Sequence, residues 1–226
     1  MATDEISGPG GSNDIIKIYH GSSRIIKAPD YLFENKNTDY GHGFYTTQNK
    51  GLSGEWAVLN SGMDGFINEY TLNCSALKIL NLEEYPVEVW MATLMLNRQG
   101  EYNDVVQERQ RAFVKKFSID ISEYDVIKGY RANDSFFTYV RDFLSVGLSK
   151  EKLIEAMRFG DLGIQICLKS KKAYETVKYI THYKASVKQY YNSAKFRDDE
   201  ARKQYRLLKN KTKGTTVLDM IGDEDD

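Results

Sequence analysis

Residues 14–22 read DIIKIYHGS, a run of β-branched and aromatic residues that ends in a glycine and a serine. Isoleucine and tyrosine fit the pleated, half-buried surface of a β-sheet, and a glycine often follows a strand where the chain turns. We therefore predict a strand over residues 14–20 that carries His20 to a turn at Gly21. The prediction thus places His20 at the end of a strand.

A second strand is predicted after a polar, glycine-rich segment. Residues 35–43 read NKNTDYGHG, which is typical of a loop, and residues 44–47 read FYTT, which has the composition of a strand. His42 lies between two glycines of that segment, and we interpret it as a loop residue. Residues 163–168 read GIQICL and predict a strongly apolar strand later in the chain.

Helical and strand patterns are interleaved through the rest of the chain. Apolar residues recur at three- and four-residue intervals over 87–97 and 105–117, which predicts two amphipathic helices. Further helices are predicted over 49–59, 135–146, 150–159 and 171–179, and further strands over 65–73, 124–129 and 182–191. This interleaving predicts an α+β fold.

The chain is expected to hold one main domain and an appendage. Its 226 residues, 41% of them hydrophobic, suffice for a core near the upper size of one compact domain. Residues 1–13 are polar and glycine-rich and are expected to be a disordered leader. Residues 14–192 are expected to form the domain, and residues 193–226 a basic helix with an acidic tail.

Composition narrows the class of protein. The formal net charge is −1, so no overall basic field indicates a nucleic-acid binder. Cys74 and Cys167 lie far apart and lack the spacing of a disulfide framework or a zinc site, which fits a reducing cytosol. No stretch has the roughly 18 apolar residues that a membrane-spanning helix requires. We therefore expect a cytoplasmic protein that makes no membrane contact.

Several common catalytic motifs are absent from the sequence. There is no GxxxxGK[ST] phosphate loop, no GxGxxG after a strand, no HExxH and no GxSxG elbow. Kinase, simple dehydrogenase and serine hydrolase functions therefore lose support.

Three segments together carry a family resemblance. YHGS at 19–22, GHGFYTT at 41–47 and GIQICL at 163–168 resemble the His-Tyr-Glu signature of diphtheria-toxin-like and poly(ADP-ribose)-polymerase-like ADP-ribosyltransferases. The chain is more closely similar to an uncharacterised bacterial family of predicted ADP-ribosyltransferases, whose members share these segments, EWA and YDVIKGYRANDS in the same order. The likeness covers about residues 14–181. It implies a split β-sheet core with surrounding helices, followed here by a C-terminal polar helix.

The resemblance implies a role for each matching residue. His20 would hydrogen-bond a ribose hydroxyl of NAD, while the main chain of Gly21 receives the nicotinamide amide and Ser22 supports the turn. Tyr45 would stack its ring on the nicotinamide and so position the leaving group. Without the resemblance, a histidine at a strand end or a tyrosine within a strand is more often a core or turn residue.

The third signature position departs from the family pattern. Where a glutamate is usual, this sequence has Gln165, which joins Gly43 and Phe44 among the residues assigned to NAD binding. ADP-ribose transfer passes through an oxocarbenium-like state that a carboxylate would stabilise, whereas a glutamine keeps only the hydrogen bond. Gln165 cannot act as a general base, so either the acceptor is already nucleophilic or another carboxylate assists. Asp134 and Asp161 are the candidates, and Asp134 is preferred as the catalytic carboxylate, although it can equally cap the helix that follows it.

The C-terminal helix leaves three interpretations open. Residues 195–213 interleave basic and aromatic side chains, which could contact nucleic acid. Equally, the helix could be solvated, with its acidic residues paired to basic ones at helical spacing, or it could dock a partner protein. Its apolar stripe is expected to be thin and to consist of Phe196, Tyr205 and Leu208.

Three functions therefore compete. The first is an enzyme that splits NAD and transfers ADP-ribose to a protein or nucleic acid, with no metal ion. The resemblance implies that such an enzyme can be a toxin of a defence or toxin–antitoxin system, with a small antitoxin protein as partner. The second is an NAD- or ADP-ribose-binding module with little activity because of Gln165. The third is nucleic-acid binding through the C-terminal helix.

Overall fold

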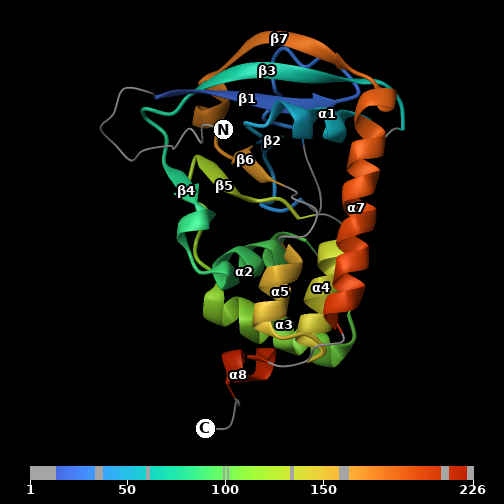
Figure 1. Ribbon diagram of the computed structural model, residues 1–226. Helices are drawn as coiled ribbons and strands as arrows, with labels where there is room; N and C mark the ends of the chain where they lie inside the picture. Colours follow the sequence, from blue (N-terminus) through green and yellow to red (C-terminus); the bar gives the residue numbers. More distant parts are fainter. Residues whose placement is uncertain are drawn as a thin grey trace.

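The protein is an α+β molecule built in three layers. The computed structural model describes residues 14–33, 38–59, 62–98, 100, 102–132, 135–157, 163–209 and 214–222. These residues form seven strands in two sheets and eight α-helices, which confirms the α+β class. Figure 1 shows the first sheet at one end, the second sheet in the middle and a group of helices at the other end. The expected leader, residues 1–13, lies outside the described residues.

The first sheet is antiparallel and has the strand order β1-β3-β7. Its strands are β1 (Ile15–Ser22), β3 (Gly65–Asn73) and β7 (Val177–Ala185). The bounds of β3 match the predicted strand. Ile18 of β1 and Tyr70 of β3, which pack against the second sheet, are completely buried.

Pairing with β3 moves the ends of the other two strands away from their predicted places. Gly21 and Ser22 pair with β3, so β1 does not turn at Gly21 as predicted. Residues from Val177 onward also pair with β3, so the helix predicted over 171–179 is limited to α6 (Lys171–Glu175). The strand predicted over 182–191 ends at Ala185. In each case the ladder of the sheet overrides the local sequence pattern.

The second sheet is mixed and has the order β2-β6-β5-β4. Its strands are β2 (Phe44–Thr46), β6 (Ile164–Leu168), β5 (Val126–Tyr130) and β4 (Ile79–Asn81). β4 and β5 are parallel, and the other neighbours are antiparallel. The short strand β4 was not predicted, because three residues carry too little periodicity to be recognised.

Helices pack against both sheets. They are α1 (Lys50–Leu59), α2 (Val87–Asn97), α3 (Asp104–Phe117), α4 (Ser135–Leu144), α5 (Lys150–Met157), α6, α7 (Val187–Lys209), α8 (Val217–Ile221) and the 3-10 helix η1 (Leu82–Glu84). α1 packs against β1, whereas α2 to α5 form the helical layer beyond the second sheet. Thr216 and Asp219 form a capping box that begins the unpredicted helix α8.

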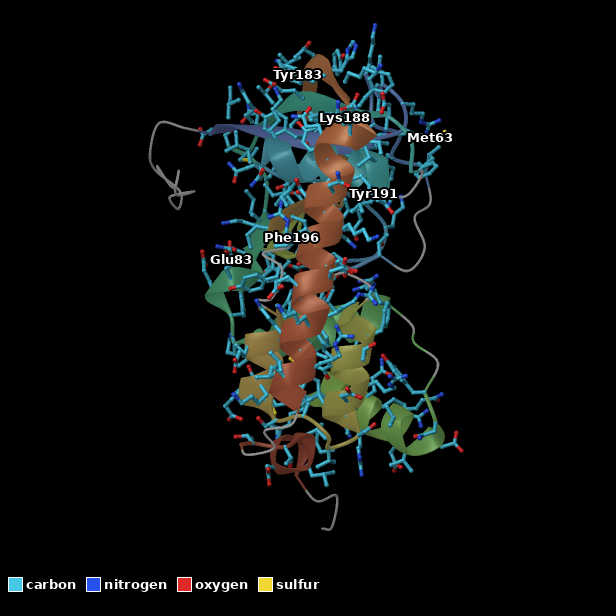
Figure 2. All side chains as sticks on the ribbon, turned by 45° about the vertical axis from the view of Figure 1, so that its right-hand side comes forward. Met63, Glu83, Tyr183, Lys188, Tyr191 and Phe196 are labelled. Carbon is cyan, nitrogen blue, oxygen red and sulfur yellow. The ribbon has the colours of Figure 1, made fainter. Side chains whose placement is uncertain are left out.

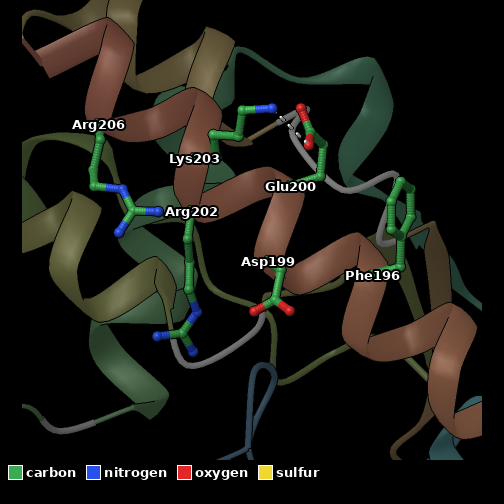
Figure 3. Close-up of a pocket in the computed structure, with 6 residues that line it drawn as sticks. All are labelled: Phe196, Asp199, Glu200, Arg202, Lys203 and Arg206. Atoms are coloured by element: carbon green, nitrogen blue, oxygen red, sulfur yellow. Dashed lines mark ion pairs between the residues drawn. The ribbon is translucent and has the colours of Figure 1, made fainter.

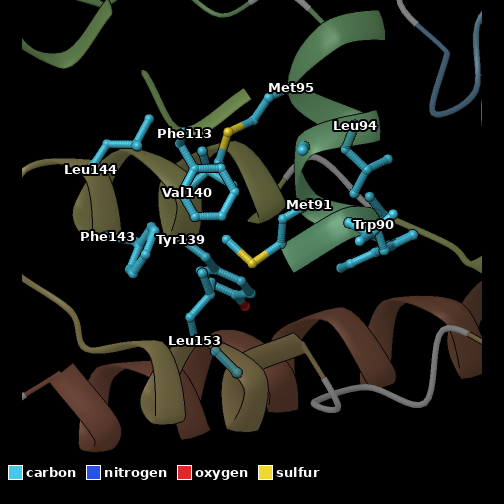
Figure 4. Close-up of a cluster of buried hydrophobic side chains, with 14 of the residues drawn as sticks. Trp90, Met91, Leu94, Met95, Phe113, Tyr139, Val140, Phe143, Leu144 and Leu153 are labelled. Atoms are coloured by element: carbon cyan, nitrogen blue, oxygen red, sulfur yellow. The ribbon is translucent and has the colours of Figure 1, made fainter. Parts of the chain in front are cut away.

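The largest hydrophobic core lies within the helical layer and against the second sheet. Trp90, Phe113 and Phe143 are at most 1% exposed, and Figure 4 shows how side chains of α2, α3 and α4 meet there. α2 is buried from Glu88 through Met95, so it is a central helix and not the amphipathic one that was predicted. This core supports the second sheet from the side opposite to the first sheet.

α7 joins the two ends of the molecule. Figures 1 and 2 show it running from the first sheet along the molecule to the helical layer. It is continuous from Val187 to Lys209, so the boundary expected between residues 192 and 193 falls inside one helix. Tyr205 and Leu208 are buried as predicted, but Phe196 is 71% exposed and is not part of the apolar stripe. Ala194 and Ala201 fill that stripe instead, because small residues let α7 approach the layers closely.

Candidate functional site

Among the described residues, main-chain hydrogen bonds join the two sheets at one point, between β1 and Thr47, which follows β2. The Tyr19 amide donates to the Thr47 carbonyl oxygen at 2.7 Å, and the Thr47 amide donates to the Tyr19 carbonyl oxygen at 2.9 Å. The Thr47 hydroxyl in turn donates to the Ile164 carbonyl oxygen of β6 at 2.9 Å. Beyond this contact the edges of the two sheets separate. The sheet is therefore split at the point where β1 presents His20 and Gly21.

His20 is held in one orientation by the neighbouring strand. Its Nδ1 lies 2.7 Å from the Tyr45 carbonyl oxygen, and its ring lies 4.5 Å from the ring of Phe44. Because a carbonyl oxygen can only accept, Nδ1 must carry the proton of the neutral imidazole. Burial lowers the pKa of His20, which favours the neutral ring. Nε2 is thereby left as a hydrogen-bond acceptor.

Gly21 combines a closed face with an open main-chain edge. A Cβ at this position would overlap the Ser53 carbonyl oxygen and meet the Ala57 amide nitrogen at 2.7 Å, so α1 requires a glycine here. Main-chain groups of residues two apart in a strand point the same way, and those of Tyr19 point to Thr47. The N–H and C=O of Gly21 therefore point to the same free edge of β1.

Ser22 stabilises the segment that follows β1. Its hydroxyl oxygen accepts a hydrogen bond from the Arg24 amide at 3.3 Å. This hydrogen bond forms at the end of β1 and not in a turn at Gly21, which is where the resemblance placed the supporting role of Ser22. His42 lies in the loop before β2, with its ring edge 5.3 Å from Tyr31, as its interpretation as a loop residue implies.

The predicted GFYTT strand brings Gly43, Phe44 and Tyr45 against β6. A Cβ at Gly43 would collide with Cys167, so this glycine allows the close approach of the two strands. The Tyr45 hydroxyl donates to the Gly41 carbonyl oxygen at 2.7 Å and accepts from the Tyr40 amide at 2.9 Å. Burial raises the pKa of Tyr45. The Tyr45 hydroxyl therefore makes its hydrogen bonds to the loop before β2, and only the ring is available for a ligand.

Gln165 lies on the face of the second sheet that carries Tyr45, not on the face that meets His20. Its neighbours Ile166 and Leu168 point between the sheets with Phe44, so Gln165 and Cys167 point to the helical layer. Gln165 is 4% exposed, and its Nε2 donates to Asp39 Oδ2 at 2.5 Å and to the Tyr130 carbonyl oxygen at 3.3 Å. No hydrogen bond or ring contact joins Gln165 to His20 among the described residues.

Asp39 is a buried carboxylate beside Gln165 that the sequence analysis did not single out. It is 6% exposed and accepts hydrogen bonds from Arg98 Nη1 at 2.9 Å and from the Ala132 amide at 3.0 Å, besides that from Gln165. Burial raises the pKa of Asp39, although Arg98 acts in the opposite direction. Asp39 is separated from Gln165 by 126 positions, so no local pattern connects the two residues. Asp134 and Asp161 lie outside the described residues.

The residues described above lie in the part of the chain that matches a known family. A family model matches residues 16–179, which is more than half of the sequence. The chain belongs to the DUF3990 family. This family is described as a protein of unknown function, and the matched range runs from β1 to the first three residues of β7, including His20, Asp39, Tyr45 and Gln165. No curated protein and no solved structure matches the DUF3990 chain.

A separate hollow of about 350 Å³ lies along α7, away from the DUF3990 residues described above. The described residues that line it are Phe196, Asp199, Glu200, Arg202, Lys203 and Arg206, shown in Figure 3. Lys203 pairs with Glu200 at 3.5 Å, and Arg202 pairs with Asp198 at 2.8 Å. These pairs neutralise part of the basic charge, as the solvated-helix interpretation implies.

The described parts of the chain contain no helix that is long and apolar enough to cross a membrane. Within the same parts, no group of three or more histidine, cysteine, aspartate or glutamate side chains could hold a metal ion.

Proposed function

We propose that this protein is an NAD-dependent ADP-ribosyltransferase that transfers ADP-ribose to a macromolecular acceptor on an ADP-ribosyltransferase-like split sheet. The observation that carries the proposal is the edge formed by His20 and Gly21 at the split. A neutral imidazole with a fixed tautomer stands beside main-chain groups that point to a free strand edge. This combination of one acceptor, one donor and one carbonyl suits a ribose hydroxyl and a carboxamide.

In this proposal β1 recognises both parts of the nicotinamide riboside. The carboxamide of nicotinamide pairs with the N–H and C=O of Gly21 as an added strand residue would, which fixes the plane of the ring. His20 Nε2 accepts a hydrogen bond from a ribose hydroxyl, because the Tyr45 carbonyl oxygen holds the only imidazole proton at Nδ1. The ring of Tyr45 supports the nicotinamide. Its hydroxyl bonds to the loop keep that ring from rotating.

The reaction breaks the bond between nicotinamide and the anomeric carbon of the ribose. Nicotinamide leaves with the electron pair of that bond, and the anomeric carbon develops positive charge. A nucleophilic atom of the acceptor then forms a bond to this carbon and loses its proton to water or to a carboxylate. In this proposal His20, Gly21 and Tyr45 supply orientation and electrostatic stabilisation. A role as a toxin restrained by a small antitoxin protein belongs to the same proposal and rests on the resemblance alone.

Labelled NAD and a cell lysate test the proposal directly. Native protein should transfer label to material that either protease or nuclease digestion removes, which identifies the acceptor class. His20→Ala should lose transfer, since it removes the acceptor for the ribose hydroxyl. His42→Ala is the matched control, because His42 is a loop histidine outside the site, and it should keep transfer. Equal labelling by the native and His20→Ala proteins would refute the proposal.

The second candidate is a module that binds NAD or ADP-ribose with little turnover. The burial of Gln165 favours it, because its amide already makes two internal hydrogen bonds. Calorimetric titration with NAD, together with an assay of released nicotinamide, separates the two functions. Saturable binding without nicotinamide release would favour the module, and release that depends on His20 would favour the enzyme.

A further inference from the structure

A buried polar cluster lies next to the proposed site, on the helical side of the second sheet. At its centre, the two oxygen atoms of the Asp39 carboxylate accept one hydrogen bond each, Oδ1 from Arg98 Nη1 and Oδ2 from Gln165 Nε2. The Tyr130 carbonyl oxygen also accepts the Tyr40 hydroxyl at 2.7 Å and Trp90 Nε1 at 3.0 Å. The cluster therefore joins the loop before β2, the end of β5 and the start of β6.

The two partners of the Gln165 amide determine which way the amide faces. Asp39 Oδ2 and the Tyr130 carbonyl oxygen are both acceptors, so the NH2 group must face them. If the amide were flipped, its oxygen would lie against two other oxygen atoms. Oε1 therefore points away from Asp39, and it accepts no hydrogen bond from the described residues. The cluster leaves one oriented acceptor on Gln165.

We propose that Asp39 is a positioning residue for Gln165, and that the two side chains together replace the glutamate of the His-Tyr-Glu signature. Asp39 supplies the negative charge, and the amide of Gln165 passes its effect on to Oε1. A hydrogen bond from the amide to a carboxylate makes the amide oxygen a stronger acceptor, because hydrogen bonds in series polarise one another. Oε1 then accepts the ribose 2'-hydroxyl. This inference rests on the proposed function.

The same geometry accounts for the departure from glutamate. A carboxylate at position 165 would face Asp39 Oδ2 across 2.5 Å and the Tyr130 carbonyl oxygen across 3.3 Å. Two carboxylates this close cannot both be ionised, so one would have to hold a proton. Among the described residues, the other titratable groups around Asp39 are Arg98, Arg131, Tyr40 and Cys167, and Arg98 already pairs with it. With Asp39 present, glutamine is the residue that fits.

An exchange of the two side chains tests the inference through activity. Gln165→Glu should reduce kcat for nicotinamide release by about 10- to 100-fold, the loss expected when one charge-assisted hydrogen bond in the transition state is removed. Asp39→Asn should have a similar effect on kcat with a smaller effect on KM. The double variant Asp39→Asn/Gln165→Glu restores one amide and one carboxylate in contact, and it should recover most of kcat.

A stability measurement on the same variants separates the inference from the proposed function. In Gln165→Glu the buried acid pair has one pKa raised above its unfolded value, so stability is present in acid and lost as pH rises through that pKa. Its Tm should therefore fall between pH 4 and pH 7, about the range of a raised carboxyl pKa, and the double variant should lack this fall. The comparison needs no NAD. The comparison uses only Gln165→Glu and the double variant. It therefore still tests the inference if the single variant Asp39→Asn does not fold because Arg98 loses its carboxylate partner.

Each outcome decides a different claim. The inference is supported if the double variant recovers kcat and its Tm does not fall between about pH 4 and pH 7. A folded double variant that stays as inactive as Gln165→Glu overturns it. An unchanged kcat in Gln165→Glu overturns it as well. If the native protein neither binds NAD nor releases nicotinamide, the proposed function fails, and the positioning role fails with it, while the pH profile still tests the Asp39–Gln165 contact.

Discussion

At the residue scale, His20 should make the stability of the fold depend on pH. Burial lowers its pKa in the folded state, so its contribution is fully present above about pH 6.5, the usual histidine pKa, and is lost as pH falls toward the lowered value. His20→Asn keeps a donor near the Tyr45 carbonyl oxygen but cannot titrate. The fall in Tm from pH 7 to pH 5 should be smaller in this variant than in the native protein. Identical profiles would show that His20 is not held neutral.

Gly129 is a second residue whose identity is fixed by one contact. A Cβ there would collide with the hydroxyl of Tyr40, which is completely buried and hydrogen-bonded to Trp90 and to the Tyr130 carbonyl oxygen. Gly129→Ala should lower the free energy of unfolding by about 1–3 kcal/mol through overpacking. Chemical denaturation measures this loss. In a Tyr40→Phe background the cost should be smaller, and an equal cost would place the clash elsewhere.

At the element scale, the end of α4 carries backbone strain. Val146 has a φ of 63°, a left-handed conformation that is costly for a β-branched residue. The amide of Val146 bonds to the Phe143 carbonyl oxygen and that of Gly147 to Asp142, so the turn ends the helix. Val146→Asn should stabilise the protein by about 1 kcal/mol and raise Tm by about 2–4 °C. A lower Tm would mean that the partly exposed valine contributes more by packing than the strain costs.

α7 offers a matched pair of aromatic residues on opposite faces of one helix. The ring of Tyr205 lies 4.1 Å from that of Tyr139, and its hydroxyl donates to Asp142 Oδ2 at 2.7 Å. Tyr205→Ala should cost about 3–5 kcal/mol, as for other buried aromatic side chains. Phe196→Ala should change stability by less than about 0.5 kcal/mol, since its side chain is largely exposed. Equal losses in urea denaturation would contradict the orientation of α7.

At the scale of the whole molecule, α7 makes the layers one cooperative unit. Arg197 pairs with Glu55 of α1 near the first sheet, while Tyr205 and Leu208 are buried in the helical layer. A chain that ends at residue 192 would lack Arg197, Tyr205 and Leu208 and would expose the residues that they contact. Its free energy of unfolding should fall by more than about 5 kcal/mol, which approaches the total stability of a domain. Circular dichroism should show no cooperative unfolding transition. A cooperative transition near the native Tm would show that residues 14–192 fold alone.

Local sequence pattern was sufficient for much of the fold. β3 and α2 were predicted with their observed bounds, although α2 is buried from Glu88 through Met95 and lacks the amphipathic pattern that was expected. The strands beside Gly21 and Gly43 were also recognised, since their composition is local, whereas the contacts of Gly21 with α1 and of Gly43 with Cys167 were not predicted. The ends of β1 and β7 and the exposure of Phe196 were missed, because partner strands and neighbouring layers decide them.

The sequence by itself determined the α+β class, the strands that carry His20, Tyr45 and Gln165, and the family resemblance that makes them candidates. Only the tertiary structure decided how these residues relate. It joins His20 to the main chain of Tyr45, turns Gln165 to the opposite face of the second sheet and places Asp39 against it. The physical reason is that a strand fixes which residues share a face, whereas contacts between residues more than a hundred positions apart depend on how the sheets and loops pack.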